Sequence, residues 1–216
     1  MKLLCLTDLH GSGAMLQRIF AAAKTADTIL LGGDLTNFGT PEDAEKIVQQ
    51  AQTLGAPVLA VAGNCDSAKI DQRLVKLAVS LHARGIVREG VGVHGLSAIP
   101  PWRGGMHQFT EEQLAAALRA GYAAIAGAKH HVVLAHVPPH GSKMDRTFIF
   151  QHVGSLALRS FIEKTQPELV ICGHVHEAHG TETLGRTLVV NCGPAARGYY
   201  ALAEVGEEIK VQLCKA

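Results

Sequence analysis

Five short apolar runs in this 216-residue sequence end in side chains of one chemical kind. The runs cover residues 2–7, 28–31, 57–62, 131–135 and 169–172. In chain order, the side chains that follow them are Asp8 and His10, Asp34, Asn64, His136, and His174 with His176. Carboxylate and amide oxygens, together with imidazole nitrogens, bind divalent cations such as Mn, Fe, Zn, Co and Ni. The pattern therefore indicates metal chemistry.

Helical patterns separate these apolar runs. They cover residues 14–24, 41–54, 71–79, 110–126 and 155–164, and further short strands are expected within 85–98, 187–190 and 199–213. Strand–helix–strand alternation with short connections is typical of parallel β-α-β units. We therefore expect an α/β sandwich with mixed sheets and helices outside. Ligands of such sheets gather beyond the carboxyl ends of the strands, where all five polar ends can meet.

Seven protein donors are too many for one ion that keeps an open position, but they suit two ions that share a bridging carboxylate. Without cations, so many ionisable groups in one place would be costly through desolvation and repulsion. The alternative is that each residue merely ends a strand in a polar loop. A polar loop explains any single one of these residues well. It explains less well why all five strands end in metal-binding side chains.

Composition excludes several classes of protein. The 20 Lys and Arg residues against 19 Asp and Glu leave a net charge of +1, so no bulk attraction to nucleic acid or anionic lipid is expected. Five cysteines without a C-x-x-C spacing indicate reduced thiols. No apolar run is long enough to span a bilayer, and the first residues do not form a signal peptide, so we expect a cytoplasmic protein without a membrane partner. Oligomeric state stays open, a dimer included.

The motifs D-x-H, G-G-D, G-N-x-D, an isolated His after a strand, and G-H-x-H occur in that order between residues 8 and 176. This ordered set resembles the calcineurin-like metallophosphoesterase family, in particular its small prokaryotic phosphodiesterase-like members. The resemblance implies one domain over residues 1–216, with a four-layer α/β/β/α sandwich of two mixed β-sheets. It also implies a phosphoesterase, most of all one that hydrolyses a phosphodiester by attack of a hydroxide bridging two divalent metal ions. Mn²⁺ is favoured, with Fe, Zn, Ni, Co and Mg as alternatives.

The family pattern also implies a role for each motif residue. Asp8, His10 and His176 would bind the first metal, and Asp34 would bridge to the second. The second metal would be bound by Asn64, His136 and His174. Asn64 and His136, with Cys65 beside them, are the residues expected to take part in catalysis.

Cys65 departs from the family pattern, which often has a His after the Asn. Where that His is present, it contacts the substrate or leaving group, so Cys65 leaves the identity of any general acid open. Some small members that resemble this chain also carry Cys there and act preferentially on phosphodiesters. The alternative is that Cys65 is a small packed residue with no part in catalysis.

Other residues have two interpretations each. His140, Lys143 and Arg146 could form a substrate rim in the 138–150 loop, or simply lie in a solvated loop. Trp102 could stack on a base and Arg103 could pair with phosphate, or Trp102 could pack in the core or an interface. Two acids next to proposed ligands could orient imidazoles or face solvent: Asp66 and Glu177. His94, in a predicted strand, is expected to be a hydrogen-bonded core residue.

Three other functions compete with a phosphodiesterase that acts on a small phosphate ester. A phosphomonoesterase, including a protein phosphatase, would use the same metals. A nuclease is less well supported because the charge is near neutral and there is no added basic domain. A non-catalytic scaffold that binds a protein partner could lose metal ligands without penalty, whereas all seven positions here carry competent donors.

Overall fold

The computed structural model describes residues 1–23 and 25–216, and over that part of the chain it contains five α-helices and eleven β-strands. The helices are α1 (Gly13–Ala23), α2 (Pro41–Gln52), α3 (Ala68–Lys76), α4 (Glu111–Ala124) and α5 (Leu156–Thr165). The strands are β1 (Lys2–Leu6), β2 (Thr28–Gly32), β3 (Val58–Val61), β4 (Gly85–Arg88), β5 (Val91–Leu96), β6 (His130–Ala135), β7 (Leu169–Cys172), β8 (Gly180–Leu184), β9 (Thr187–Asn191), β10 (Tyr199–Val205) and β11 (Ile209–Lys215). Three short 3-10 turns complete them: η1 (Lys143–Asp145), η2 (His176–Ala178) and η3 (Ala195–Arg197).

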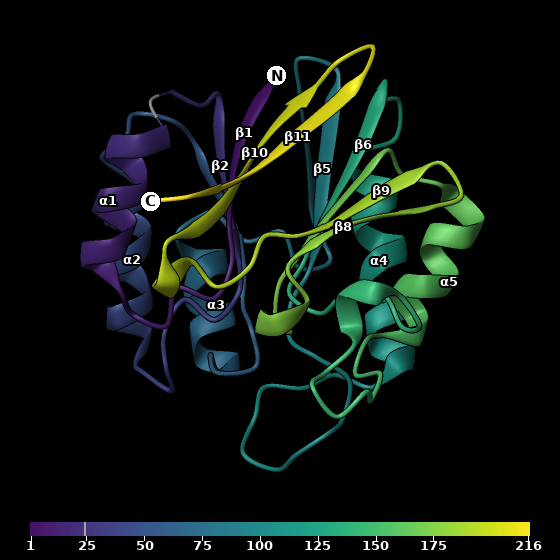
Figure 1. Cartoon of the computed structure of the whole chain (residues 1–216), viewed down its shortest axis with the longest axis horizontal. Coiled ribbons are helices and arrows are strands. Elements are labelled where there is room, and N and C mark those ends of the chain that lie inside the picture. Colours follow the sequence, from purple (N-terminus) through teal and green to yellow (C-terminus); the bar gives the residue numbers. More distant parts are fainter. Residues whose placement is uncertain (24) are drawn as a thin grey trace.

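The strands form two mixed sheets (Figure 1). The first has the order β11-β10-β1-β2-β3, in which β1, β2 and β3 are parallel and β10 is antiparallel to both of its neighbours. The second has the order β4-β5-β6-β7-β9-β8, with four parallel strands in the middle and antiparallel β4 and β8 at the edges. The expectation of two mixed sheets is confirmed.

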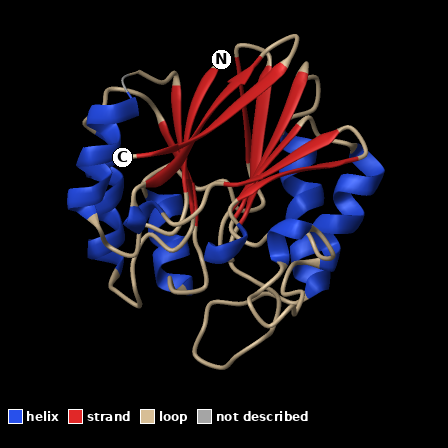
Figure 2. Ribbon diagram, in the orientation of Figure 1, coloured by secondary structure: helices blue, strands red, loops and turns tan. Residues whose placement is uncertain are grey.

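Helices cover the outer face of each sheet, so the layers run α/β/β/α as expected (Figure 2). Helices α1, α2 and α3 pack on the first sheet, and α4 and α5 pack on the second. Strand β1 shows why its sequence is continuously apolar: Leu4 and Leu6 face the helices, whereas Leu3 and Cys5 face the other sheet. A strand buried on both faces has no position for a polar side chain until it ends.

Helix caps fix where the chain leaves the loops near the site. The Thr40 side chain accepts a hydrogen bond from the backbone N–H of Asp43, whose carboxylate accepts from Thr40 in return, and Pro41 occupies the first turn of α2. Thr110 and Gln113 form the same reciprocal pair at the start of α4. Both caps agree with the sequence patterns that predicted these helices.

Two elements differ from expectation. Helix α3 begins at Ala68 rather than Asp71, because the Ser67 side chain caps it by accepting from the N–H of Ile70. Strand β8 is not predicted, because this edge strand lacks an apolar run and leaves alternate side chains exposed. The last residue of the helix expected over 14–24, Lys24, lies outside the described residues.

His94 also differs from expectation. Its side chain is fully buried against the rings of Tyr122 and Phe161. Within residues 1–23 and 25–216, neither of its ring nitrogens has a hydrogen-bond partner. The expectation that His94 is a core residue is therefore confirmed, whereas the expected hydrogen bond is wrong.

The parallel strands of both sheets end at the same side of the molecule. In the view of Figure 1 this is the lower end, where the teal loop around residues 97–110 and the green loop around residues 138–155 extend beyond the sheets. The two sheets therefore present their carboxyl ends, and the side chains that follow them, to one region.

Candidate metal centre

The seven predicted ligands come from loops that follow five parallel strands of the two sheets. Asp8, His10, Asp34 and Asn64 follow β1, β2 and β3 of the first sheet, and His136, His174 and His176 follow β6 and β7 of the second. Backbone hydrogen bonds join neighbouring loops: the N–H of His10 donates to the carbonyl of Asp34, and the N–H of Gly173 donates to that of His136. Side chains 168 positions apart in the chain are thereby brought together.

Asp8, His10 and His176 form the first group of donors. Nε2 of His176 lies 3.4 Å from Nε2 of His10 and 3.3 Å from Oδ1 of Asp8. One ligand atom from each of the three residues lies within 4.8 Å of the other two. Atoms this close, all directed at one point, can share a cation.

His136, Asn64 and His174 form the second group. Nε2 of His136 lies 2.9 Å from Oδ1 of Asn64, and the ring centroid of His174 lies 5.2 Å from that of His136. Nδ1 of His136 lies 3.0 Å from the carbonyl oxygen of Gly32, to which it can donate. That contact favours the tautomer whose Nε2 lone pair is free to bind a metal.

Asp34 lies between the two groups. Its Oδ2 is 3.9 Å from Nε2 of His10, in the first group, and its Oδ1 is 3.6 Å from Nε2 of His136, in the second. Oδ1 also accepts a hydrogen bond of 2.7 Å from the backbone N–H of Cys65. One carboxylate that directs its two oxygens at two donor groups has the arrangement of a bridging ligand.

Ionisation of two buried donors, Asp8 and His174, suits cation binding. Burial raises the pKa of Asp8, but the hydrogen bond with His176 and the nearby His136 outweigh that effect and bring the pKa to about 2. Burial lowers the pKa of His174 to about 3, so its imidazole is neutral at pH 7. Metals bind carboxylates and neutral imidazoles, so these two groups already carry the protonation states that binding requires.

The backbone is strained at four of the seven positions. Asp8, His10, Asp34 and His174 have φ values of +57°, +47°, +47° and +67°, in the left-handed region that non-glycine residues seldom adopt. Such conformations cost about 1–3 kcal/mol each, and they cluster at functional sites, where the surrounding structure enforces them. Here the loop geometry directs the four side chains toward a common centre.

Two glycines of the motifs make room for ligand carboxylates. A Cβ atom at Gly63 would overlap Oδ1 of Asp34, and one at Gly173 would overlap Oδ2 of Asp8. Both overlaps are too severe for any larger residue. The glycines before Asn64 and His174 are therefore required by close approach.

Residues outside the motifs hold the loops in place. The buried Asp66 does not orient an imidazole: its carboxylate accepts from the N–H groups of Leu35, Thr36 and Gly63, and so joins the loops after β2 and β3. Asn191, at the end of β9, donates to the carbonyls of Gly173 and Val175 at 3.3 and 2.9 Å. No sequence pattern points to Asn191, because its partners are backbone atoms of a distant loop.

Cys65 is half-buried at the edge of the donor groups. Its Sγ accepts a hydrogen bond from Nδ2 of Asn64 at 3.3 Å, which leaves Oδ1 of that amide directed at His136. Sγ also lies within 4.8 Å of ligand atoms of His10 and Asp34. Cys65 thus contacts the candidate centre directly rather than packing in the core.

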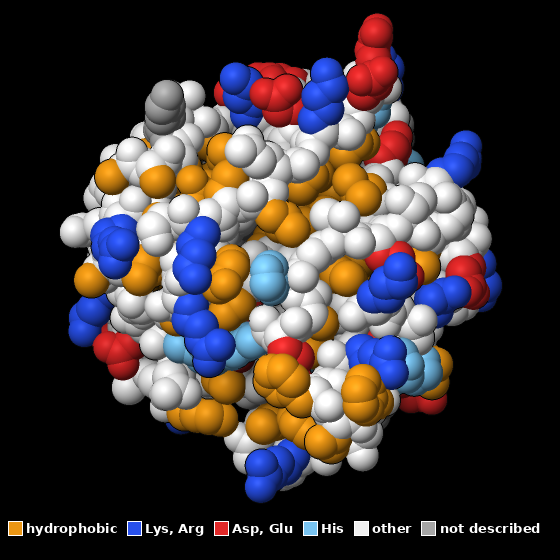
Figure 3. Space-filling model, viewed as in Figure 1, with side chains coloured by type: hydrophobic (Ala, Val, Ile, Leu, Met, Phe, Trp, Pro, Cys, Tyr) orange, Lys and Arg blue, Asp and Glu red, His pale blue; other side chains and the backbone are white. Residues whose placement is uncertain are grey.

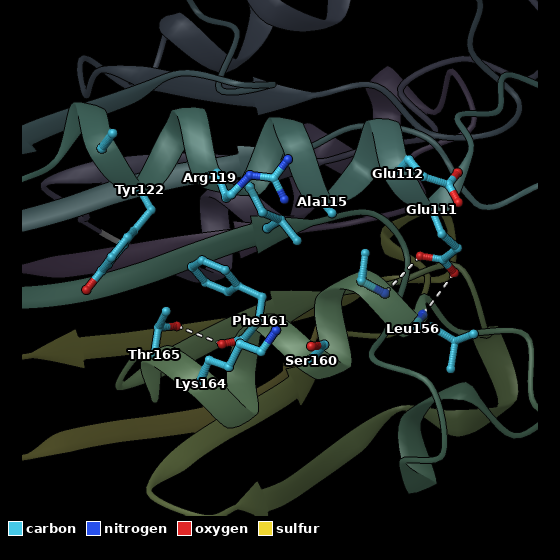
Figure 4. Close-up of a pocket in the computed structure, with 13 residues that line it drawn as sticks. Glu111, Glu112, Ala115, Arg119, Tyr122, Leu156, Ser160, Phe161, Lys164 and Thr165 are labelled. Atoms are coloured by element: carbon cyan, nitrogen blue, oxygen red, sulfur yellow. Dashed lines mark hydrogen bonds between the residues drawn. The ribbon is translucent and has the colours of Figure 1, made fainter.

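A separate cavity of about 520 Å³ lies on the far side of the second sheet, between α4 and α5 (Figure 4). Leu118, Tyr122 and Phe161 contribute apolar walls, while Glu111 at one end accepts hydrogen bonds from the backbone of Leu156 and Ala157. Its lining includes none of the seven donors.

Comparisons with known proteins find relatives over nearly the whole chain. Residues 1–207 match the model of the calcineurin-like phosphoesterase superfamily domain. The uncharacterized protein MJ1162 of Methanocaldococcus jannaschii is 30% identical over 208 residues, which cover 93% of this chain and 90% of that protein. The UPF0046 protein K07C11.7 of Caenorhabditis elegans is 26% identical over 219 residues, covering 92% of this chain and 71% of that protein.

Solved structures share the fold. The crystal structure of TT1561 of Thermus thermophilus has a TM-score of 0.76 with 17% identity, covering 99% of this chain and 98% of that one.

Within the described residues, no helix combines the length and apolar character needed to cross a bilayer. From the family match over nearly the whole chain and the fold, we conclude that this chain belongs to the calcineurin-like phosphoesterase superfamily.

Proposed function

We propose that this protein is a phosphodiesterase that works with two divalent cations held by the seven donors. Family membership supports a metal-dependent phosphoester hydrolase. Our proposal specifies in addition that the substrate is a diester and that two metal ions take part. The observation that carries it is the position of Asp34, whose two carboxylate oxygens face His10 on one side and His136 on the other.

The donor set fits such cations. Asp8, His10 and His176 would hold one ion and Asn64, His136 and His174 the other, with Asp34 shared. Oxygen and imidazole donors without an obligatory thiolate suit Mn²⁺, which we favour, and also Fe, Zn, Co, Ni or Mg. As in the family pattern, we assign Asn64, Cys65 and His136 to the catalytic side of the centre, and we take residues 1–216 to act as a single domain.

Bound cations of this kind lower the pKa of water and polarise phosphoryl oxygens. The residues of the chain would place the ester for that chemistry. Nδ2 of Asn64 donates to Sγ of Cys65, which directs Oδ1 of the same amide toward Nε2 of His136, 2.9 Å away. His136 is fixed in turn by the Gly32 carbonyl. A rigid constellation of this type gains its rate from positioning rather than from movement.

Cys65 supports a preference for esters with good leaving groups. A protein that protonates a poor leaving group needs an acid with a pKa near the working pH, and histidine serves best. The thiol at this position is a weaker acid, so esters whose alcohol leaves without full protonation should be the better substrates. The preference for diesters over monoesters rests on the resemblance to small family members that carry Cys at this position.

The test compares two substrates on one protein. Chelated protein is reloaded with Mn²⁺, Zn²⁺ or Co²⁺, its metal content is measured, and hydrolysis of bis(4-nitrophenyl) phosphate is compared with that of 4-nitrophenyl phosphate. We expect two ions per chain, higher kcat/KM on the diester, and no activity after chelation. Asp34→Asn should bind fewer than two ions and lose activity.

Three results would count against the proposal. Activity that persists in excess chelator after confirmed metal loss would remove the metal from the mechanism. A higher kcat/KM on the monoester would make the protein a phosphomonoesterase. Protein that neither retains cations nor hydrolyses either ester would be a binding scaffold on the same fold.

A further inference from the structure

Large apolar side chains are exposed in three loops at the carboxyl ends of the strands. Phe38 is 61% exposed, Trp102 57%, Phe148 81% and Phe150 69%. Figure 3 shows hydrophobic side chains on the surface at the lower end of the molecule, the end at which Figure 1 places these loops. Single exposed apolar residues are common, but several exposed aromatic rings on loops at the same end of the molecule indicate a binding surface.

Each of these loops is joined to a proposed metal ligand or its neighbour. The Trp102 ring lies perpendicular to the ring of His174, with centroids 6.3 Å apart. The backbone N–H of Phe148 donates to the carboxylate of Glu177, which follows His176, at 2.9 Å. The N–H of Phe38 donates to the carbonyl of Cys65 at 2.8 Å. The Trp102 ring therefore lies beside a proposed ligand, and the backbones of Phe148 and Phe38 are attached to residues next to the proposed ligands.

The loop that carries Phe148 and Phe150 is held by internal contacts. The fully buried Asp145 pairs with Nδ1 of His152 at 2.6 Å and accepts from the backbone N–H groups of Gly141 and Gly154. The guanidinium of Arg146 lies 4.4 Å from the centre of the Phe150 ring. Because the loop is fixed in this way, its apolar rings stay at the surface instead of folding inward.

We infer that the centre selects phosphoesters whose organic group carries a flat aromatic ring, which stacks on Trp102 next to His174. This inference rests on the proposed phosphoesterase function and names its substrate class. The exposed ring of Trp102 is flat, which suits a planar ring better than an alkyl group. Arg103, next to Trp102, and Arg146 supply positive charge for a ligand that also carries phosphate. Stacking of a base on a protein ring corresponds to roughly tenfold in affinity.

Three phosphonates, which the protein cannot hydrolyse, test this without turnover. Phenylphosphonate, cyclohexylphosphonate and methylphosphonate are titrated into the full chain saturated with Mn²⁺, and Kd is measured by calorimetry. We expect phenylphosphonate to bind about tenfold more tightly than the other two. Trp102 is the only tryptophan, so its fluorescence reports whether the ring stacks there: phenylphosphonate should change the emission more than the non-planar cyclohexyl compound.

Matched variants locate the effect. Trp102→Ala should bring the Kd of phenylphosphonate to that of methylphosphonate, whereas Trp102→Phe keeps a ring and should retain most of the preference. Leu213→Ala, at an exposed apolar residue on β11, should leave all three Kd values unchanged.

The outcomes separate this inference from the proposed function. Equal binding of the three phosphonates by a protein that hydrolyses diesters would overturn the inference and leave the function standing. Absence of both hydrolysis and phosphonate binding would overturn both. Binding to phosphatidylcholine–phosphatidylglycerol vesicles, or self-association lost in Trp102→Ala, would assign the rings to a membrane or a second copy and would also overturn the inference.

Discussion

At the scale of single residues, the thiol of Cys65 is a weak acid beside the proposed metal centre. Burial, followed by the negative charge of Asp34, raises the pKa of its thiol above the ordinary value. A thiol that holds its proton this firmly is a poor donor to a departing alkoxide. Hydrolysis of substrates with poor leaving groups should therefore be slow, and its rate should depend on which residue occupies position 65.

Replacing Cys65 with His tests that relation. Histidine has an ordinary pKa of about 6.5, closer to the working pH, so turnover of esters with alkyl leaving groups should rise by about tenfold while that of 4-nitrophenyl esters changes little. The measurement is kcat across a series of leaving groups, with Cys65→Ser as control. Equal or lower rates on the alkyl esters, at unchanged metal content, would contradict it.

Gly63 makes a second prediction at this scale. In Gly63→Ala the added methyl group meets Asp34, the proposed bridge, so both metal content and stability should fall, the latter by about 1–3 kcal/mol. Metal analysis and urea unfolding report the two effects. Gly104→Ala, where a Cβ meets nothing within 4 Å, is the matched control and should resemble the unaltered protein. Full metal content in Gly63→Ala would argue against Asp34 as a bridge.

At the scale of elements, helices α4 and α5 are joined through one side chain. Glu111, in the first turn of α4, accepts from the N–H groups of Leu156 and Ala157 at the start of α5 (Figure 4). It also accepts from the hydroxyl of Ser155. A carboxylate at a helix N-terminus satisfies free N–H groups and interacts favourably with the helix dipole. One residue of α4 thus completes the neighbouring helix.

Glu111→Ala should lower the free energy of unfolding by about 1–2 kcal/mol, the range typical of a lost cap. Urea unfolding measures this, and metal content should stay unchanged because α4 and α5 lie outside the second sheet, away from the seven donors. The neighbour Glu112, which makes none of these contacts, provides the control Glu112→Ala. A loss of metal in Glu111→Ala would show that α5 does more than cover the sheet.

The elements also show what the sequence can predict. Apolar runs that end in Asp, Asn or His located five strands and the residues after them, because a buried strand admits no polar side chain before its end. The periodicity of apolar residues does not reveal which strands are neighbours, so the sequence does not predict the antiparallel pairing of β10 with β1. Strand β8 was missed because it is a polar edge strand, and Asn191 because its role lies in backbone contacts with a distant loop.

At the scale of the whole molecule, the buried His94 makes stability depend on pH. Burial lowers its pKa to about 4, below the ordinary value of about 6.5 that it regains in the unfolded chain. The unfolded chain therefore binds a proton more readily, so stability is complete above about pH 6.5 and falls as the pH drops toward 4. The total loss from this one group is about 3 kcal/mol.

His94→Leu should remove that loss. The free energy of unfolding, measured with urea, should fall between pH 7 and pH 5 by about 2 kcal/mol more in the original protein than in the variant. Comparing the difference between the proteins cancels the titration of the other histidines. An equal loss of stability in the original protein and in His94→Leu would mean that protonated His94 has a hydrogen-bond partner in the folded state.

The proposed metals should stabilise the entire fold, because each ion would take ligands from both sheets. Binding at 100 times Kd contributes about 2.7 kcal/mol per site, which corresponds to roughly 5–10 °C in Tm for a chain of this length. Calorimetry of metal-free and Mn²⁺-loaded protein measures the shift. In Asp34→Asn the rise in Tm on adding Mn²⁺ should be small. A rise equal to that of the original protein would mean that the ions bind elsewhere.

The layer between the two sheets has a consequence for reactivity. If the ions are held by loops from both sheets, then the packing of Leu30, Val61 and Leu134 between the sheets fixes how far apart those loops stand. A change of volume in that layer would alter the separation of the ions without touching a ligand. Rate optimisation, by selection or by design, can thus proceed through hydrocarbon side chains that never meet the substrate.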